Sequence, residues 1–231
     1  MAAGNDDVLH KVEIVEAEPG TFWHVYDTRY SPVAGNPASK ARLAWRDGNH
    51  AMFYAADTRA AALWETVLRY ASVNRGNVYT DRSHLKDKAL VKLQLVAKAE
   101  VLDLRTPHRR AIVTTDSDLD GQWDLVLKDP VHKNTHHFTT RVMAQLAAAG
   151  YKDGVALRWH SRMSGAETAT LFYEPPMKAD WWTYKPEDIY LLDTPAGEEQ
   201  IRQALAEQKL RWVGPPIFKD DPEDGAVDSE T

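Results

Sequence analysis

A chain of 231 residues that is 43% apolar, with eight Trp and nine Tyr, has enough material to bury one sizeable core. It contains no cysteine, which excludes disulfides, thiolate metal sites and a cysteine nucleophile. The formal charge of −6 comes from six acids in the last twelve positions, because the other 28 acids balance the 28 Lys and Arg; a body without net positive charge disfavours nucleic-acid binding.

The first predicted elements are two strands and a helix. Aromatic and β-branched residues predict a strand at 22–26, and an apolar run predicts a buried strand at 51–55. Asp57 and Thr58 then offer an N-cap to a helix that runs to about Tyr70. In this prediction a loop separates the two strands, and the helix directly follows the second, buried strand.

Further along, short strands outnumber helices and do not alternate with them regularly. This pattern predicts an α+β fold in which helices flank a mixed β core, rather than a doubly wound sheet. The predicted strands are 91–96, 101–104, 154–157, 168–173 and 188–192, and the predicted helices are 135–149 and 197–209.

We expect a single domain over 21–218, with an irregular, polar lead-in at 1–20 and an acidic, disordered tail at 219–231. The lead-in lacks the basic and apolar segments of a signal peptide, and no apolar stretch is long enough to cross a membrane. We therefore expect a cytoplasmic protein.

Common signatures of nucleotide and metal sites are absent from the sequence. It contains no glycine-rich dinucleotide motif, no Walker loop and no His-Glu-x-x-His. His132, His136 and His137 resemble a metal cluster at first sight, but Pro130 precedes them and no third ligand with suitable spacing is evident. We interpret them as the start of a surface helix and expect no metal.

Four stretches together carry the informative pattern. The first is an aromatic strand with a polar end at 22–32, and the second is Ala-Arg-Leu at 41–43. The third, at 52–67, joins a Tyr-x-Ala strand to an Ala-rich helix containing Glu-Thr-Val, and the fourth is an Asp-Gly…Ser-Arg segment at 153–162. In order and spacing they resemble the RES domain of bacterial toxin–antitoxin toxins, over residues 21–175.

The RES family takes its name from an arginine, a glutamate and a serine in that order along the chain. The resemblance carries the glutamate onto Glu65 and the serine onto Ser161, and implies catalytic roles for both. It carries the family's strand tyrosine onto Tyr54 and its second arginine onto Arg42, although Leu follows where the family has Phe or Trp. The leading arginine falls on His24, which departs from the family pattern.

The resemblance implies an ADP-ribosyltransferase-like fold that takes NAD⁺ as its substrate and breaks the nicotinamide–ribose bond, by hydrolysis, phosphorolysis or transfer to a protein. It also implies a partner antitoxin of the Xre helix-turn-helix type. Nicotinamide leaves as a neutral ring from a cationic one, so the energetic cost lies in an oxocarbenium-like transition state. A carboxylate such as Glu65 stabilises that charge, and the Ser161 hydroxyl can orient the substrate.

Five further residues are predicted to contact NAD⁺. The forked guanidinium of Arg42 matches a pyrophosphate, with Arg29 as an alternative, and the rings of Tyr54 and Tyr30 offer faces to nicotinamide. His24 replaces the family's arginine functionally only as an imidazolium, and its unperturbed pKa is about 6.5. In that case the affinity for NAD⁺ weakens as the pH rises through the pKa of His24.

Other interpretations of the same residues stay open. Glu65 can be a solvated helix residue, and Tyr30 and Tyr54 can be ordinary core aromatics. A non-enzymatic binding module is the second candidate function, because His24 can reflect the loss of a phosphate anchor. An RNA-directed toxin is the third, and its best support is the basic segment 105–110. Release of nicotinamide from NAD⁺ separates the first function from the other two.

Overall fold

A mixed nine-stranded sheet forms the centre of the computed structural model, which describes residues 7–113 and 118–214. Its strands are β1 (Val15–Ala17), β2 (Gly20–Asp27), β3 (Ala51–Ala56), β6 (Lys88–Leu95), β7 (Ala99–Asp103), β8 (Ala156–His160), β9 (Thr168–Glu174), β10 (Trp182–Thr183) and β11 (Ile189–Leu191). Their order is β1-β7-β8-β9-β3-β2-β6-β10, and β11 also pairs with β6. β7 and β8 run parallel, whereas the other strand pairs of this sheet are antiparallel.

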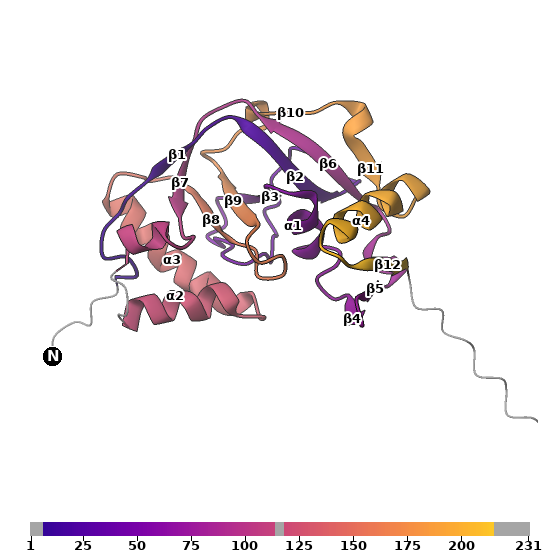
Figure 1. The fold of residues 1–231 in the computed structure, drawn as a ribbon. Coiled ribbons are helices and arrows are strands. Elements are labelled where there is room, and N and C mark those ends of the chain that lie inside the picture. The colour runs from indigo at the N-terminus through magenta and orange to yellow at the C-terminus, as the bar shows by residue number, and fades with distance from the viewer. Residues whose placement is uncertain (1–6, 114–117, 215–231) are drawn as a thin grey trace, which may run out of the picture.

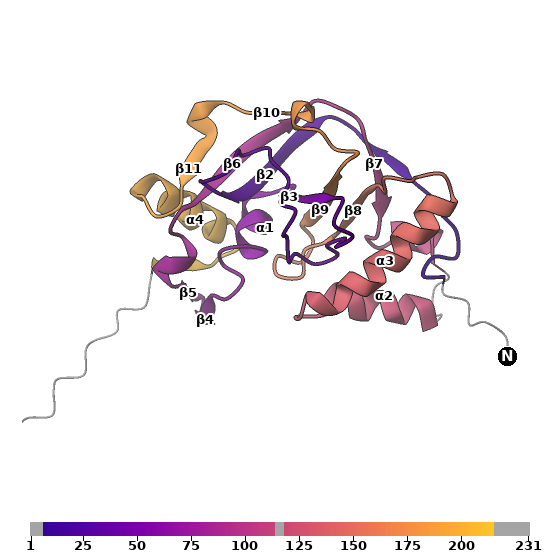
Figure 2. The ribbon, with the colours of Figure 1, turned by 180° about the vertical axis from the view of Figure 1, so that it is seen from behind.

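Four α-helices and a small second sheet complete the described part of the chain. The helices are α1 (Arg59–Trp64), α2 (Asp118–Lys128), α3 (Lys133–Ala148) and α4 (Pro195–Glu207), and the small sheet consists of β4 (Ser72–Asn74), β5 (Asn77–Tyr79) and β12 (Arg211–Gly214). In Figures 1 and 2 the main sheet curves into an arch, with α2 and α3 beside β7 and β8 on one flank and α1, α4 and the small sheet on the other.

Each flank has its own apolar core. On one, α2 and α3 contribute Trp123, Phe138 and Val142 to a cluster with Trp159 of β8. On the other, the small residues of α1 pack with α4 and the inner face of β2 and β6. The opposite face of the sheet is covered by an aromatic cluster around Phe53, in which the Phe53 and Trp182 rings lie 5.0 Å apart. None of the helices in the described ranges is long and apolar enough to cross a membrane.

The main sheet is interrupted at its centre. β2 forms eight paired positions with β6, and β3 forms six with β9, but β2 and β3 pair only at Trp23 and Ala56. Beyond this point their backbone groups need other partners, because unpaired buried backbone groups are costly. His24 supplies one: its Nδ1–H donates to the carbonyl oxygen of Tyr54 across the gap, at 2.5 Å.

The predicted α+β class and single domain are confirmed, and most predicted strands and helices form within a few residues of their expected bounds. The lead-in, however, is not irregular throughout: it contains β1, and Val8 and Leu9 are buried in the core. The helix expected to reach Tyr70 ends at Trp64. The sequence did not predict α2, the small sheet or the short strand β10. The acidic tail at 219–231 lies outside the described residues.

Candidate active site

Glu65 and Ser161, which are 96 positions apart in the sequence, meet in the structure. Glu65 is the C-cap of α1, a helix that begins with Thr58 Oγ1 accepting a hydrogen bond from the Ala61 amide. The Oε1 atom of Glu65 accepts hydrogen bonds from Ser161 Oγ (2.7 Å) and from the Arg162 amide (3.0 Å). In the described part of the chain its Oε2 accepts none, so one carboxylate oxygen is left for a ligand.

The hydrogen bonding of the chain changes where α1 ends. The hydroxyl of Thr66 donates to the carbonyl of Ala62 at 2.5 Å, which is the acceptor that the Thr66 amide would use in a continuing helix. The Thr66 amide bonds instead to Leu63. The chain leaves the helical path directly after Glu65, and a tight turn follows.

Ser161 follows β8 and begins a compact loop. Its amide donates to the Glu167 carbonyl (2.7 Å), and its carbonyl accepts from the Gly165 amide (3.0 Å). Its hydroxyl accepts from the Ser164 amide (3.2 Å) while donating to Glu65, and the residue is only 2% exposed. Both functions of the hydroxyl are thus engaged, which fixes its orientation.

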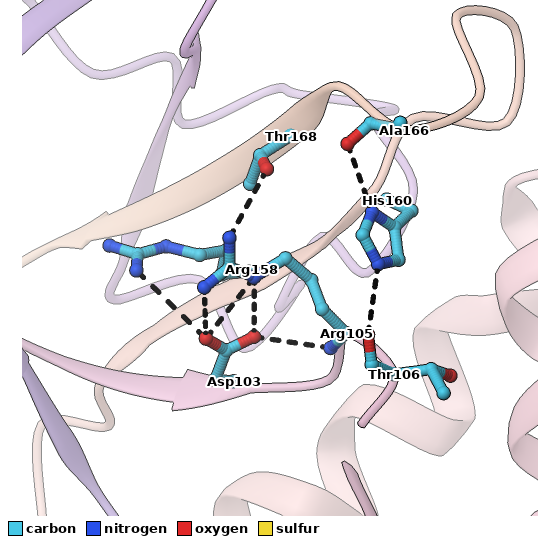
Figure 3. Close-up of polar contacts among 7 residues, drawn as sticks. All are labelled: Asp103, Arg105, Thr106, Arg158, His160, Ala166 and Thr168. Carbon is cyan, nitrogen blue, oxygen red and sulfur yellow. Dashed lines mark hydrogen bonds and ion pairs between the residues drawn. The ribbon is translucent and has the colours of Figure 1, made fainter. Parts of the chain in front are cut away.

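A polar network holds both ends of this loop (Figure 3). The buried carboxylate of Asp103 accepts hydrogen bonds from Arg105 at 2.6 and 2.9 Å and lies 4.0 Å from Arg158. Burial opposes ionisation of Asp103, but the hydrogen bonds from Arg105 and the charge of Arg158 outweigh it and lower the pKa of that carboxyl. Arg105 also reaches the Thr168 hydroxyl at 3.4 Å.

His160 also contacts the loop that follows Ser161. Its two ring nitrogens lie 3.2 Å from the Ala166 carbonyl and 3.3 Å from the Thr106 carbonyl, as Figure 3 shows. The sequence did not indicate this network, because it joins residues of β7, β8 and β9 that are far apart in the chain. The only local signal was the pairing of Asp103 with an arginine two positions later.

Arg42 and Tyr54 lie in the electrostatic environment of Glu65. Arg42 is 2% exposed, and its Nη1 donates to the Val126 carbonyl at 2.9 Å. Burial lowers its pKa, and the charge of Glu65 opposes that effect. Burial also raises the pKa of Tyr54 well above its ordinary value, with Glu65 as the next cause. The Tyr54 hydroxyl is buried and has no hydrogen-bond partner among the described residues.

The remaining predicted contacts line a cavity of about 780 Å³ at the open end of the gap between β2 and β3. His24 lies in its wall, with Arg29 and Tyr30 from the following loop and Thr66 and Val67 from the turn after Glu65. Tyr30 is 65% exposed and is therefore not a core aromatic.

The two positive charges in this wall share one carboxylate partner. Asp27 accepts hydrogen bonds from Arg29 Nε (2.8 Å) and Lys88 Nζ (2.9 Å). These two cations hold the pKa of the Asp27 carboxyl well below its usual range. Arg29 is thus engaged within the protein, which weakens it as an alternative phosphate ligand.

The surroundings of His24 disfavour its imidazolium form. Burial lowers its pKa to about 4, and the hydrogen bond to Tyr54 opposes this only in part. Near neutral pH the ring is therefore neutral, with Nδ1 protonated toward the Tyr54 carbonyl. His24 lies in the cavity wall, but as a neutral ring it does not supply the charge of an arginine.

Two other sequence features have partners in the structure. In the basic segment 105–110, Arg105 is engaged with Asp103, and Arg109 forms ion pairs with Asp120 and Asp124. This leaves little free positive charge for RNA. Among the three histidines, His132 Nδ1 accepts from Arg69 and His136 Nε2 bonds to the Ala41 carbonyl. Within the described ranges no group of three or more His, Cys, Asp or Glu is placed to hold a metal ion.

Comparison with known proteins matches one family. The family model described as the RES domain matches residues 18–189. No curated protein matches the sequence. Among solved structures, a chain of the crystal structure of the M. tuberculosis MbcT-MbcA toxin-antitoxin complex aligns with a TM-score of 0.51 and 17% identity, covering 80% of this chain and 90% of that chain. At this identity the similarity concerns the fold.

Proposed function

The chain belongs to the RES-domain family, and from this premise we propose that it is the toxin of a toxin–antitoxin pair, an enzyme that breaks the nicotinamide–ribose bond of NAD⁺. The hydrogen bond between Glu65 and Ser161 carries the proposal, because it brings together the two residues that the family resemblance identifies as catalytic. The fold shared with a chain of a toxin–antitoxin complex supports an antitoxin partner, which we propose to be of the Xre type.

The cavity supports a small-molecule substrate. Its volume of about 780 Å³ lies within the range of ligand pockets, which is roughly 300–1,000 Å³. Thr66 and Val67 in its wall directly follow Glu65 in the sequence, although Glu65 itself is not among the lining residues. The exposed ring of Tyr30, at the rim, offers a face on which an aromatic ring can stack.

In the proposed reaction the bond between ribose C1′ and the nicotinamide nitrogen breaks, and its electron pair goes to the ring, which leaves neutral. C1′ then carries the positive charge of an oxocarbenium ion until an acceptor adds to it, and the acceptor loses its proton to solvent. Glu65 stabilises this charge with its unpartnered Oε2, and Ser161 fixes Oε1 so that the carboxylate does not reorient during the reaction.

The test is the release of nicotinamide from NAD⁺ by the purified chain, followed by chromatography. Glu65→Gln keeps the shape of the side chain and removes its charge, so we expect turnover to fall by about a hundredfold or more with an unchanged melting temperature. Glu199→Gln on α4, where the residue pairs with Arg202, is the matched control and should leave turnover unchanged. Full turnover by a folded Glu65→Gln variant would contradict the assignment.

A non-enzymatic binding module is a second candidate, because His24 is neutral where the family has a charged arginine. The same assay separates the two functions. A module binds NAD⁺, measurable by calorimetry, without releasing nicotinamide. The enzyme does both, and its expression without a partner should lower cellular NAD⁺ in a Glu65-dependent manner.

A further inference from the structure

Two arginines near Glu65 lack a carboxylate partner. Ion pairs in the described part of the chain engage most of its buried or half-buried guanidinium groups, but none includes Arg42 or Arg69. Arg42 donates to a carbonyl through Nη1, and its Nε is buried without a partner. Because a buried charge is costly without a counter-charge, this arrangement favours an anionic ligand.

Arg69 is held in place by neutral acceptors. Its Nη1 donates to His132 Nδ1 and its Nη2 to the Pro130 carbonyl, both at 2.9 Å. Burial lowers the pKa of His132 to about 3, with the charges of Arg42 and Arg69 as further causes, and the ring also bonds to the backbone of Lys40. A neutral ring accepts from Arg69 without compensating its charge, so the guanidinium is fixed in position and still cationic.

Arg69 lies beside a residue of the cavity wall. It belongs to the turn that follows Glu65, four positions later, and its guanidinium carbon lies 5.3 Å from the centre of the Tyr70 ring, which lines the cavity. The charges that act on Arg42 show how crowded this region is: Glu65 and Asp129 are negative, and Arg69 and Arg162 are positive. Together with Arg42 itself, the cluster carries one positive charge in excess.

We propose that Arg69, fixed by His132 and assisted by Arg42, binds a phosphate group of the substrate. The inference rests on the proposed function, which supplies a substrate with a pyrophosphate. Arg69 then supplies the fixed positive charge that His24 does not provide. A planar guanidinium forms paired, charge-assisted hydrogen bonds with phosphate oxygens, and His132 acts as a positioning residue that leaves the charge free.

The test uses inorganic pyrophosphate as the probe, with binding measured by calorimetry on the full chain. Arg69→Gln should weaken binding about ten- to a hundredfold, the usual worth of a hydrogen bond to a charged group. Arg202→Gln, which removes a guanidinium from the exposed face of α4, is the matched control and should bind as the wild type does.

Two near-isosteric substitutions at His132 separate the effect of the Arg69 charge from the effect of the Arg69 position. In His132→Asn the side-chain oxygen can still accept from Arg69 as a neutral group, and binding should be retained. In His132→Asp a carboxylate pairs with Arg69 and cancels its charge, so binding should fall about as far as in Arg69→Gln. A melting temperature for each variant establishes that it is folded.

The outcomes distinguish this proposal from the proposed function. Pyrophosphate binding that depends on Arg69 supports the anion site even if the chain releases no nicotinamide from NAD⁺. Wild-type protein that does not bind pyrophosphate overturns it. So does binding that is the same in folded Arg69→Gln or His132→Asp protein as in the wild type, even if NAD⁺ cleavage is intact.

Discussion

Acid is expected to destabilise the protein through His24. The ring is 8% exposed, donates to the Tyr54 carbonyl and packs against Phe53 with ring centres 4.4 Å apart. Burial lowers its pKa to about 4, whereas the unfolded chain returns the ring to water and a pKa of about 6.5. Between these values the unfolded state binds more protons than the folded state, so the stability falls as the pH falls from about 6.5 towards 4.

The size of the effect follows from the two pKa values. One pH unit corresponds to about 1.4 kcal/mol, so the loss from His24 reaches about 3 kcal/mol below both values, and about 2 kcal/mol of it appears between pH 7 and pH 4.5. His132 acts in the same direction because its pKa is also lowered. A variant that lacks only the titration of His24 is therefore needed to isolate its share.

His24→Asn is that variant, because its amide can donate to the Tyr54 carbonyl from nearly the position of Nδ1. Urea denaturation at pH 7 and pH 4.5 gives the free energy of unfolding of both proteins, and the wild type should lose about 2 kcal/mol more than the variant. Equal losses would refute the assignment of a buried, neutral ring. A Michaelis constant for NAD⁺ that rises between pH 5.5 and 8 in the wild type but not in His24→Asn would show that the ring is protonated in the complex.

Two further predictions concern stability. Asp103→Asn leaves the charge of Arg105 without its partner beside the Ser161 loop, and should lower the free energy of unfolding by about 3 kcal/mol, measured by urea denaturation at pH 7. Gly197→Ala would place Cβ 2.0 Å from the Leu191 carbonyl oxygen and should cost about 2 kcal/mol or more despite the better helix propensity of alanine. Its control is Gly121→Ala in α2, where no atom lies within 4 Å of the new Cβ; it should gain up to about 1 kcal/mol, and a similar loss at both sites would refute the steric argument.

Strands with continuous apolar or aromatic character could be predicted, because their pattern is local. β9 is buried along nearly its whole length, and the sequence shows this as a run of β-branched, apolar and aromatic residues. β1 could not be predicted in this way. The segment before it is held by distant contacts: the Val8 and Leu9 amides donate to Gln145 Oε1, and Trp123 Nε1 donates to the Val8 carbonyl. No local signal encodes partners more than a hundred residues away.

The candidate site likewise has residues that could be predicted from the sequence and residues that could not. Glu65 and Ser161 were predicted only through the family resemblance, since neither residue is unusual in its local context. α1 ends at Trp64 with Glu65 as its C-cap, whereas apolar periodicity predicted a longer helix. Arg69 carries no signal in the sequence, because its significance comes from its contact with His132, and that histidine suggested only a metal ligand or a helix start.

The break between β2 and β3 accounts for what His24 does in this fold. Two strands that separate leave backbone groups that need partners, and they also leave the space that the cavity uses. The short ring of His24 stays within the gap and satisfies the Tyr54 carbonyl, and burial there keeps it uncharged. A histidine in this place therefore maintains the gap but cannot attract a phosphate. Arg42 and Arg69 are the candidates for that function, because neutral acceptors hold their guanidinium groups and leave their charge available to a ligand.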